Sequence, residues 1–130
     1  MRPDTRNWME SSQYDLETAQ HMLASGRYLY VIYMCHLSLE KLLKAAVTEA
    51  TGQPAPRSHD LISLAKRAGL DLGRDYQRFV GKLNDAGVIA RYPEDMRKAM
   101  KDYTEDVAGD YLRRTEELAH WLRAHPLLAR

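Results

Sequence analysis

Four glycines divide this sequence into stretches that are rich in helix-forming residues. Gly26, Gly52, Gly69 and Gly87 each follow such a stretch, at the point where a residue in the left-handed conformation commonly ends a helix. No segment alternates apolar and polar residues over a useful length, and no Asn-Gly or Asp-Gly turn is present, so strands are not expected. The predicted helices cover residues 4–25, 28–51, 60–68, 73–87 and 104–124.

The length of the chain indicates how these helices are arranged. A chain of 130 residues suits one domain, since typical domains run to ~100–150 residues. It can bury roughly two thirds of its unfolded surface, so neither a metal nor a disulfide is needed for folding. We therefore predict an all-α fold, an antiparallel up-and-down bundle of four or five helices, formed by a single domain over residues 1–130.

The charge balance and the single cysteine narrow the class of protein. Nineteen Lys and Arg against eighteen Asp and Glu argue against a broad nucleic-acid-binding surface and leave room only for a local basic patch. One cysteine cannot form an internal disulfide, and the N-terminal stretch lacks the apolar core of a signal peptide. The longest apolar run, residues 28–35, is far shorter than the ~20 residues of a transmembrane helix. The sequence predicts a soluble, cytoplasmic protein with no membrane segment.

A polar stripe on the second predicted helix is the most informative motif. His36, Glu40 and Lys44 follow in steps of four, so they stand one above another at the edge of a broad apolar face. One interpretation is a boundary salt bridge between Glu40 and Lys44, with His36 hydrogen-bonded in the seam of the bundle. The other is a polar cleft between the first two helices, to which Asp15 contributes because a half-buried charge needs a partner.

The loop over residues 52–60 also has two interpretations. Ser58 or Asp60 can cap the short third helix. His59 is then either an exposed loop residue or, together with Arg57, a contact for an anionic ligand where the second helix ends.

A bend is predicted at residues 90–93. Pro93 disfavours helical geometry at Tyr92, so the chain must turn there. At such a bend Arg91 can hold a phosphate and Tyr92 can stack on a base. Alternatively, Tyr92 closes the end of the bundle and Arg91 pairs with a carboxylate.

The last predicted helix carries two arginines and a histidine. Arg113 and His120 share a face two turns apart, whereas Arg114 and His120 diverge by ~120°. An arginine and a histidine can cleave RNA without a metal, the arginine stabilising the transition state and the histidine moving a proton. The acidic neighbours on that face favour ordinary surface ion pairs instead. The histidines lack the spacing of metal ligands, so no metal and no cofactor are expected.

Four segments, taken in order, carry a resemblance to a known family: YDLETAQHMLASGRYLYVIYMCHLSLEKLLKAA (14–46), SHDLISLAKRAGL (58–70), LNDAGVIARYPED (83–95) and YTEDVAGDYLRRTEELAHWLRAH (103–125). The chain resembles the HEPN family (higher eukaryotes and prokaryotes nucleotide-binding domain) over nearly its whole length. The resemblance implies an antiparallel bundle of four or five helices that is often dimeric. Small bacterial members bind a minimal nucleotidyltransferase and were viewed as its substrate-binding subunit, whereas other branches are metal-independent RNases of toxin–antitoxin and defence systems.

The resemblance also implies roles for particular residues. Those that match the small bacterial branch would bind nucleotide or phosphate: Asp15, His36, Glu40, Lys41, Lys44, His59, Asp60, Arg91 and Tyr92. The RNase branches carry an arginine four to six residues before a histidine, a count that both Arg113 and Arg114 satisfy with His120.

The first hypothesis is therefore a module that binds nucleotide or RNA phosphate, forms a homodimer and serves a minimal nucleotidyltransferase in a toxin–antitoxin-like system. The alternatives are a metal-independent endoribonuclease toxin that uses Arg113 or Arg114 with His120, and a purely structural bundle that docks another protein.

Overall fold

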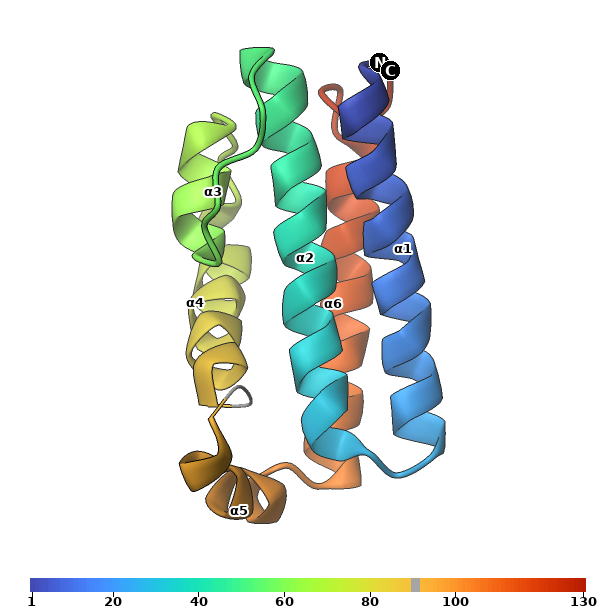
Figure 1. Ribbon diagram of the computed structural model, residues 1–130, viewed down its shortest axis with the longest axis vertical. Helices are drawn as coiled ribbons and strands as arrows, with labels where there is room; N and C mark the ends of the chain where they lie inside the picture. The colour runs from blue at the N-terminus through green and yellow to red at the C-terminus, as the bar shows by residue number, and fades with distance from the viewer. Residues whose placement is uncertain (90–91) are drawn as a thin grey trace.

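The computed structural model describes the backbone of residues 1–89 and 92–130, and within these ranges all side chains except those of residues 89, 93 and 95. The described chain contains six α-helices and no strand, which confirms the predicted all-α fold (Figure 1). The helices are α1 (Pro3–Ala24), α2 (Tyr28–Thr51), α3 (Leu61–Arg67), α4 (Gly73–Ile89), α5 (Pro93–Asp102) and α6 (Glu105–Ala124).

Helix α5 was not among the helices predicted from the sequence. Its residues were expected to form a connection between two helices. Pro93 was interpreted only as a break, but a proline is also well suited to the first position of a helix, where its missing N–H costs nothing. Tyr92 precedes α5 in an extended conformation (φ −113°, ψ 123°), so the predicted departure from helical geometry at Tyr92 is confirmed.

Three of the four glycines end helices as predicted, and one does not. Gly26, Gly52 and Gly69 have positive φ angles of 81°, 68° and 69°. Gly87 instead lies inside α4, which continues to Ile89. The prediction of a helix end at Gly87 was wrong because its missing side chain serves the packing of α4 on α2 rather than a turn.

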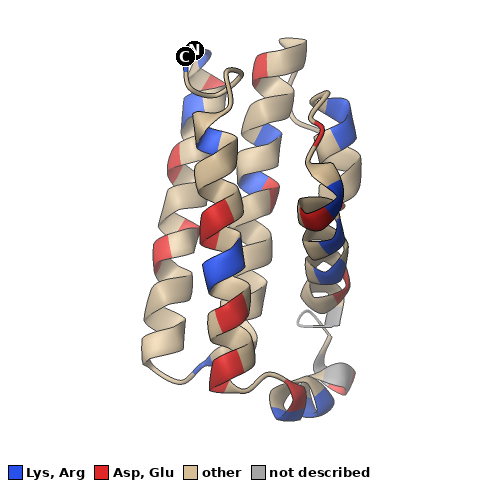
Figure 2. Ribbon diagram, turned by 180° about the vertical axis from the view of Figure 1, so that it is seen from behind, with Lys and Arg blue, Asp and Glu red and all other residues tan. Residues whose placement is uncertain are grey.

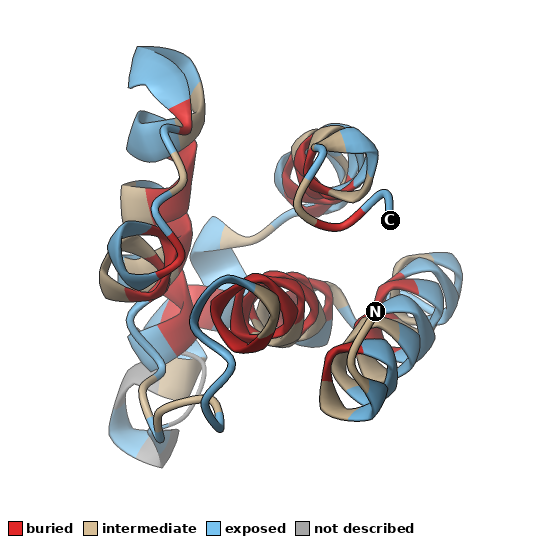
Figure 3. Ribbon diagram, turned by 90° about the horizontal axis from the view of Figure 1, so that it is seen from above, coloured by how far each residue is buried: buried red, intermediate tan, exposed pale blue. Residues whose placement is uncertain are grey.

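Helix α2 is the centre of the bundle (Figures 1 and 3). Helix α1 packs along one side of it, α3 and α4 cover the other side, and α6 runs behind. This position explains the broad apolar face of α2, whose side chains at Ile32, Leu39, Leu42 and Leu43 are fully buried. Each buried side chain of this size stabilises the fold by about 1.5–3 kcal/mol. Polar groups on the buried faces of α2 must therefore find their partners inside the bundle.

Helix α5 lies across the end of the bundle opposite the two chain termini (Figure 1). Cys35 is buried beneath α6, and this burial raises the pKa of its thiol to about 12, so the thiol is not a nucleophile at neutral pH. Within the described ranges, no helix is both long and apolar enough to cross a membrane.

Candidate functional site

The carboxylate of Glu40 is the centre of a buried polar cluster on α2. Glu40 is only 4% exposed. Oε1 lies 2.9 Å from Nδ1 of His59 and 3.7 Å from Nδ1 of His36, and Oε2 accepts a hydrogen bond of 3.2 Å from Nζ of Lys44. A buried carboxylate is tolerated only when such partners compensate for its lost hydration. The structure thus brings together four of the predicted site residues.

Lys44 is the most deeply enclosed cation of this cluster. The residue is 6% exposed, and its Nζ lies 5.3 Å from the ring centroid of Trp8 on α1. The ammonium therefore sits between the Glu40 carboxylate and an aromatic face, both of which favour a positive charge. In this position Lys44 supports the packing of α1 on α2 and is not exposed to a dissolved phosphate.

Asp15 does not join the Glu40 cluster as the cleft hypothesis expected. Its Oδ2 lies 2.7 Å from Nζ of Lys41, in an ion pair between α1 and α2. Lys41 is one position further along α2 than Glu40, about 100° around the helix, so the two carboxylates serve different lysines. Lys41 remains partly exposed, unlike Lys44.

His59 links the buried cluster to solvent. Its side chain is 64% exposed, yet Nδ1 bonds to the buried Glu40 carboxylate. A ring that donates from Nδ1 keeps Nε2 as its free nitrogen, and a carboxylate in this role fixes the ring orientation. The bond to Glu40 therefore holds Nε2 of His59 in a defined position.

A pocket of about 290 Å³ lies beside this ring, between α2, α3 and α4. Its walls are His36, His59, Asp60, Asn84, Asp85 and Val88. The pocket thus combines imidazole groups with carboxylate and amide oxygens, and one apolar side chain. This mixture is suited to a polar organic ligand that has both acceptors and donors.

Of the two caps predicted for the third helix, Ser58 and Asp60, the structure has Asp60, which also forms part of the pocket wall. Oδ1 of Asp60 accepts hydrogen bonds from the backbone N–H groups of Ile62 and Ser63 and from Nδ2 of Asn84, the last at 2.8 Å. Oδ1 of Asn84 in turn accepts from the N–H of Leu61. These bonds, with the Asn84 bond as the largest cause, lower the pKa of Asp60 from its ordinary value of 3.8.

We expect Asp60→Ala to reduce the free energy of unfolding by about 1 kcal/mol at neutral pH, because a helix cap and the Asn84 bond are lost together. The lowered pKa means that this stabilisation is present above pH 3.8 and is lost as the pH falls through the folded-state pKa. Urea unfolding of parent and variant at pH 7 and at low pH measures the difference. A difference that is unchanged at low pH would show that the ionised carboxylate is not the stabilising group.

The predicted bend at residues 90–93 lies only partly within the described residues. Arg91 lies outside the described residues. Tyr92 is half exposed and immediately precedes α5, and it does not line the pocket beside His59.

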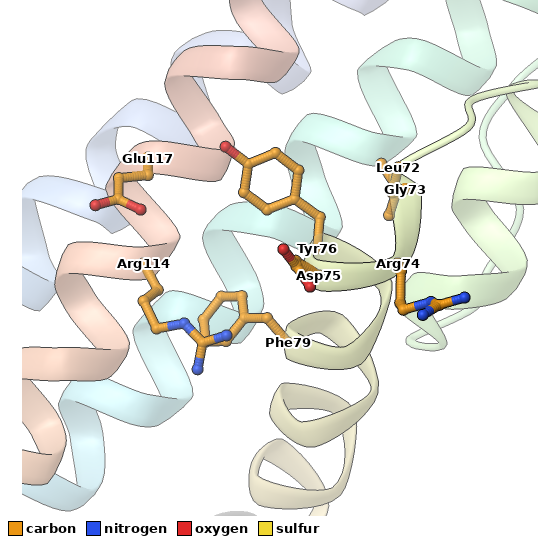
Figure 4. A pocket seen from close by; sticks show the side chains of 8 residues that line it. All are labelled: Leu72, Gly73, Arg74, Asp75, Tyr76, Phe79, Arg114 and Glu117. Carbon is orange, nitrogen blue, oxygen red and sulfur yellow. The ribbon is translucent and has the colours of Figure 1, made fainter.

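The two arginines of α6 occupy different environments. Arg113 is exposed and pairs with Asp110 at 2.6 Å and Glu117 at 2.9 Å, the surface ion pairs that its acidic neighbours favoured. Arg114 is half buried, and its guanidinium carbon lies 4.5 Å from the ring centroid of Phe79 on α4. It lines a second hollow between α4 and α6, whereas His120 is exposed and does not line it (Figure 4).

A role at this site was not predicted from the sequence for two residues, Asn84 and Gly87. Asn84 lies on α4 between the buried residues Val80 and Gly87, and a polar residue on an otherwise apolar face was the available signal. At Gly87, an added Cβ would lie 2.6 Å from Cδ2 of His36. This close approach of α4 to α2 cannot be predicted from a single glycine within a helical pattern.

The described residues hold no group of His, Cys, Asp and Glu side chains that could bind a metal ion. The structure thus defines the class of this protein as an all-α bundle. Its distinguishing feature is a buried histidine–glutamate–lysine cluster behind an exposed histidine.

The HEPN domain model matches residues 5–125, so the chain belongs to the HEPN domain family. Membership supports a nucleotide- or RNA-related role for this helical domain. The chain is also similar to the crystal structure of TT1696 from Thermus thermophilus, with a TM-score of 0.78 and 21% sequence identity over 94% of this chain and 98% of that one. This likeness shows a shared fold. Among curated proteins, none matches the sequence.

Proposed function

We propose that this HEPN protein binds the phosphate of a nucleotide or of RNA at His59, and that it serves as the partner or substrate-binding subunit of a minimal nucleotidyltransferase in a toxin–antitoxin-like pair. The observation that carries the proposal is the exposed His59 ring, which the buried Glu40 carboxylate holds at the mouth of a pocket. The nucleotidyltransferase partner and a homodimer are part of the proposal through the family resemblance.

Different side chains of the pocket bind the two parts of the ligand, the phosphate and the nucleoside. Protonated His59 donates from Nε2 to a phosphate at the solvent side, where the negative charge keeps most of its hydration. Asn84 and Asp85 line the same pocket from α4 and offer oxygen acceptors to hydroxyl or amino groups of the nucleoside. This orientation also keeps the phosphate away from the carboxylates of the pocket wall, which would repel it.

Binding is a better description of this geometry than RNA cleavage. Cleavage would require an arginine and a histidine that act on one phosphate. His120 does not line the hollow beside Arg114, and Arg113 is already paired with two carboxylates. Neither of the two predicted arginines therefore shares a described pocket with His120.

We expect His59→Gln to weaken the binding of AMP or of a short RNA by about tenfold or more, the cost of one charge-assisted hydrogen bond. The fold should be retained because the side chain is largely exposed. Isothermal titration calorimetry measures the affinity, and circular dichroism checks the fold. The matched control is His21→Gln, which changes an exposed histidine at the far end of α1. Equal affinities of parent and His59→Gln would disprove the assignment.

A further inference from the structure

Two cationic side chains are held against aromatic rings where α4 meets α6. Nζ of Lys82 lies 5.3 Å from the ring centroid of Tyr111, and the guanidinium carbon of Arg114 lies 4.5 Å from that of Phe79. The two rings are themselves neighbours, with centroids 5.9 Å apart. Lys82 and Arg114 therefore present their charges side by side on one surface, each restrained by a cation–π contact.

Neither charge is neutralised by the described part of the chain. Among residues 1–89 and 92–130, no described carboxylate lies within ion-pair distance of Lys82 or Arg114, whereas the adjacent Arg113 pairs with two. Arg74 and Arg78 precede Lys82 in steps of four and are exposed, so Lys and Arg recur along α4 (Figure 2). In a protein whose net charge is only +1, Lys82 and Arg114 thus lie at this seam without an ion pair to a described carboxylate.

A hollow of about 550 Å³ adjoins one of these cations, Arg114. It lies between the start of α4 and the middle of α6, and Arg114 reaches across the ring of Phe79 at its edge (Figure 4). Leu72 and Tyr76 contribute apolar surface, and the carboxylates of Asp75 and Glu117 line the hollow as well. The hollow therefore offers room for an apolar group directly beside a positive charge.

We propose that this α4–α6 seam docks an acidic segment of a protein partner, in which carboxylates alternate with apolar side chains. The carboxylates bind Arg114 and Lys82, and an apolar side chain enters the hollow against Leu72 and Tyr76. Arginine clusters recognise acidic motifs in this way, and cations whose rotamers are already restrained lose little entropy on binding.

The same features disfavour a nucleic acid at this surface. Strands of RNA gain affinity from bases stacked on exposed aromatic faces, but Arg114 and Lys82 already cover faces of Phe79 and Tyr111. A phosphodiester chain also carries its charges without interruption, so it would meet the carboxylates of Asp75 and Glu117 that line the hollow. A peptide can place its apolar residues there instead.

The test uses the full-length protein and a fluorescein-labelled peptide in which Glu and Leu alternate, with fluorescence anisotropy as the readout. A peptide with Gln in place of Glu and an oligouridine of similar length are the comparison ligands. We expect the double variant Lys82→Gln with Arg114→Gln to bind the Glu peptide about tenfold more weakly than the parent, and Lys82→Gln alone to lose part of that affinity. Lys82 is exposed, so its variant folds even if Arg114→Gln disturbs the packing on Phe79.

Arg113→Gln is the control for a neighbouring charge that is already paired, and His59→Gln separates this surface from the proposed nucleotide pocket; both should bind the peptide as the parent does. Equal binding of the Glu and Gln peptides, an unchanged affinity in both Lys82 variants, or no binding of the Glu peptide overturns the proposal. Oligouridine binding that disappears in the double variant, without peptide binding, would identify the seam as a nucleic-acid surface and overturn it as well.

Discussion

Replacing Glu40 by alanine is expected to reduce the free energy of unfolding by about 3–5 kcal/mol, because breaking a buried ion pair leaves the other charge uncompensated. In this variant the buried ammonium of Lys44 keeps, among the described residues, only the ring of Trp8, 5.3 Å away, and His59 loses the acceptor that orients it. Since domains of this size are stable by about 5–15 kcal/mol, the loss is a large part of the total. Urea unfolding at neutral pH, followed by circular dichroism, measures it.

The matched control replaces both charges. Glu40→Leu combined with Lys44→Met fills the same space with apolar groups, and such exchanges of buried ion pairs are often neutral. We expect the double variant to recover most of the stability that Glu40→Ala loses. A Glu40→Ala variant that loses less than about 1 kcal/mol would show that the pair is hydrated like a surface pair.

The same double variant separates stability from ligand binding. It restores the packing of α2 but not the hydrogen bond to Nδ1 of His59. We therefore expect it to fold but to bind nucleotide poorly, because Glu40 no longer orients the His59 ring. Stability and site geometry thus depend on one carboxylate through different partners.

The sequence was sufficient to predict features that depend on neighbouring residues. The stripe of His36, Glu40 and Lys44, the helix cap at Asp60 and the limits of α2 all follow from spacings of a few residues along one chain segment. Helical geometry fixes such relations whatever the rest of the molecule does.

Contacts between distant segments could not be predicted in the same way. A helical wheel gives the angle of Asp15 around α1 but not the height and rotation of α1 against α2, and these decide that its partner is Lys41. His59 reaches Glu40 only because the loop before α3 folds back along α2. The burial of Lys44 likewise depends on Trp8 of another helix.

Gly87→Ala is expected to destabilise the protein by about 2–3 kcal/mol, the cost of overpacking a well-filled interior. The added Cβ would lie 2.6 Å from Cδ2 and 2.8 Å from Cγ of His36, well inside van der Waals contact. The His36 ring cannot easily move away, because the residue is only 2% exposed and stands beside the Glu40 carboxylate. The expected sign is the reverse of the usual one, since alanine is favoured over glycine inside a helix by up to about 1 kcal/mol.

Gly81→Ala in the same helix provides the control. There the nearest atom to an added Cβ is Cδ1 of Ile62 at 3.7 Å, an ordinary contact, so this substitution should stabilise the protein slightly. Thermal unfolding of the two variants should therefore shift in opposite directions from the parent. Gly87→Ala combined with His36→Ala removes the ring that causes the clash and should be less destabilising than the sum of the two single changes. If Gly87→Ala stabilised the protein as Gly81→Ala does, α4 would not approach α2 closely at His36, and the α4 wall of the His59 pocket would have to be placed differently.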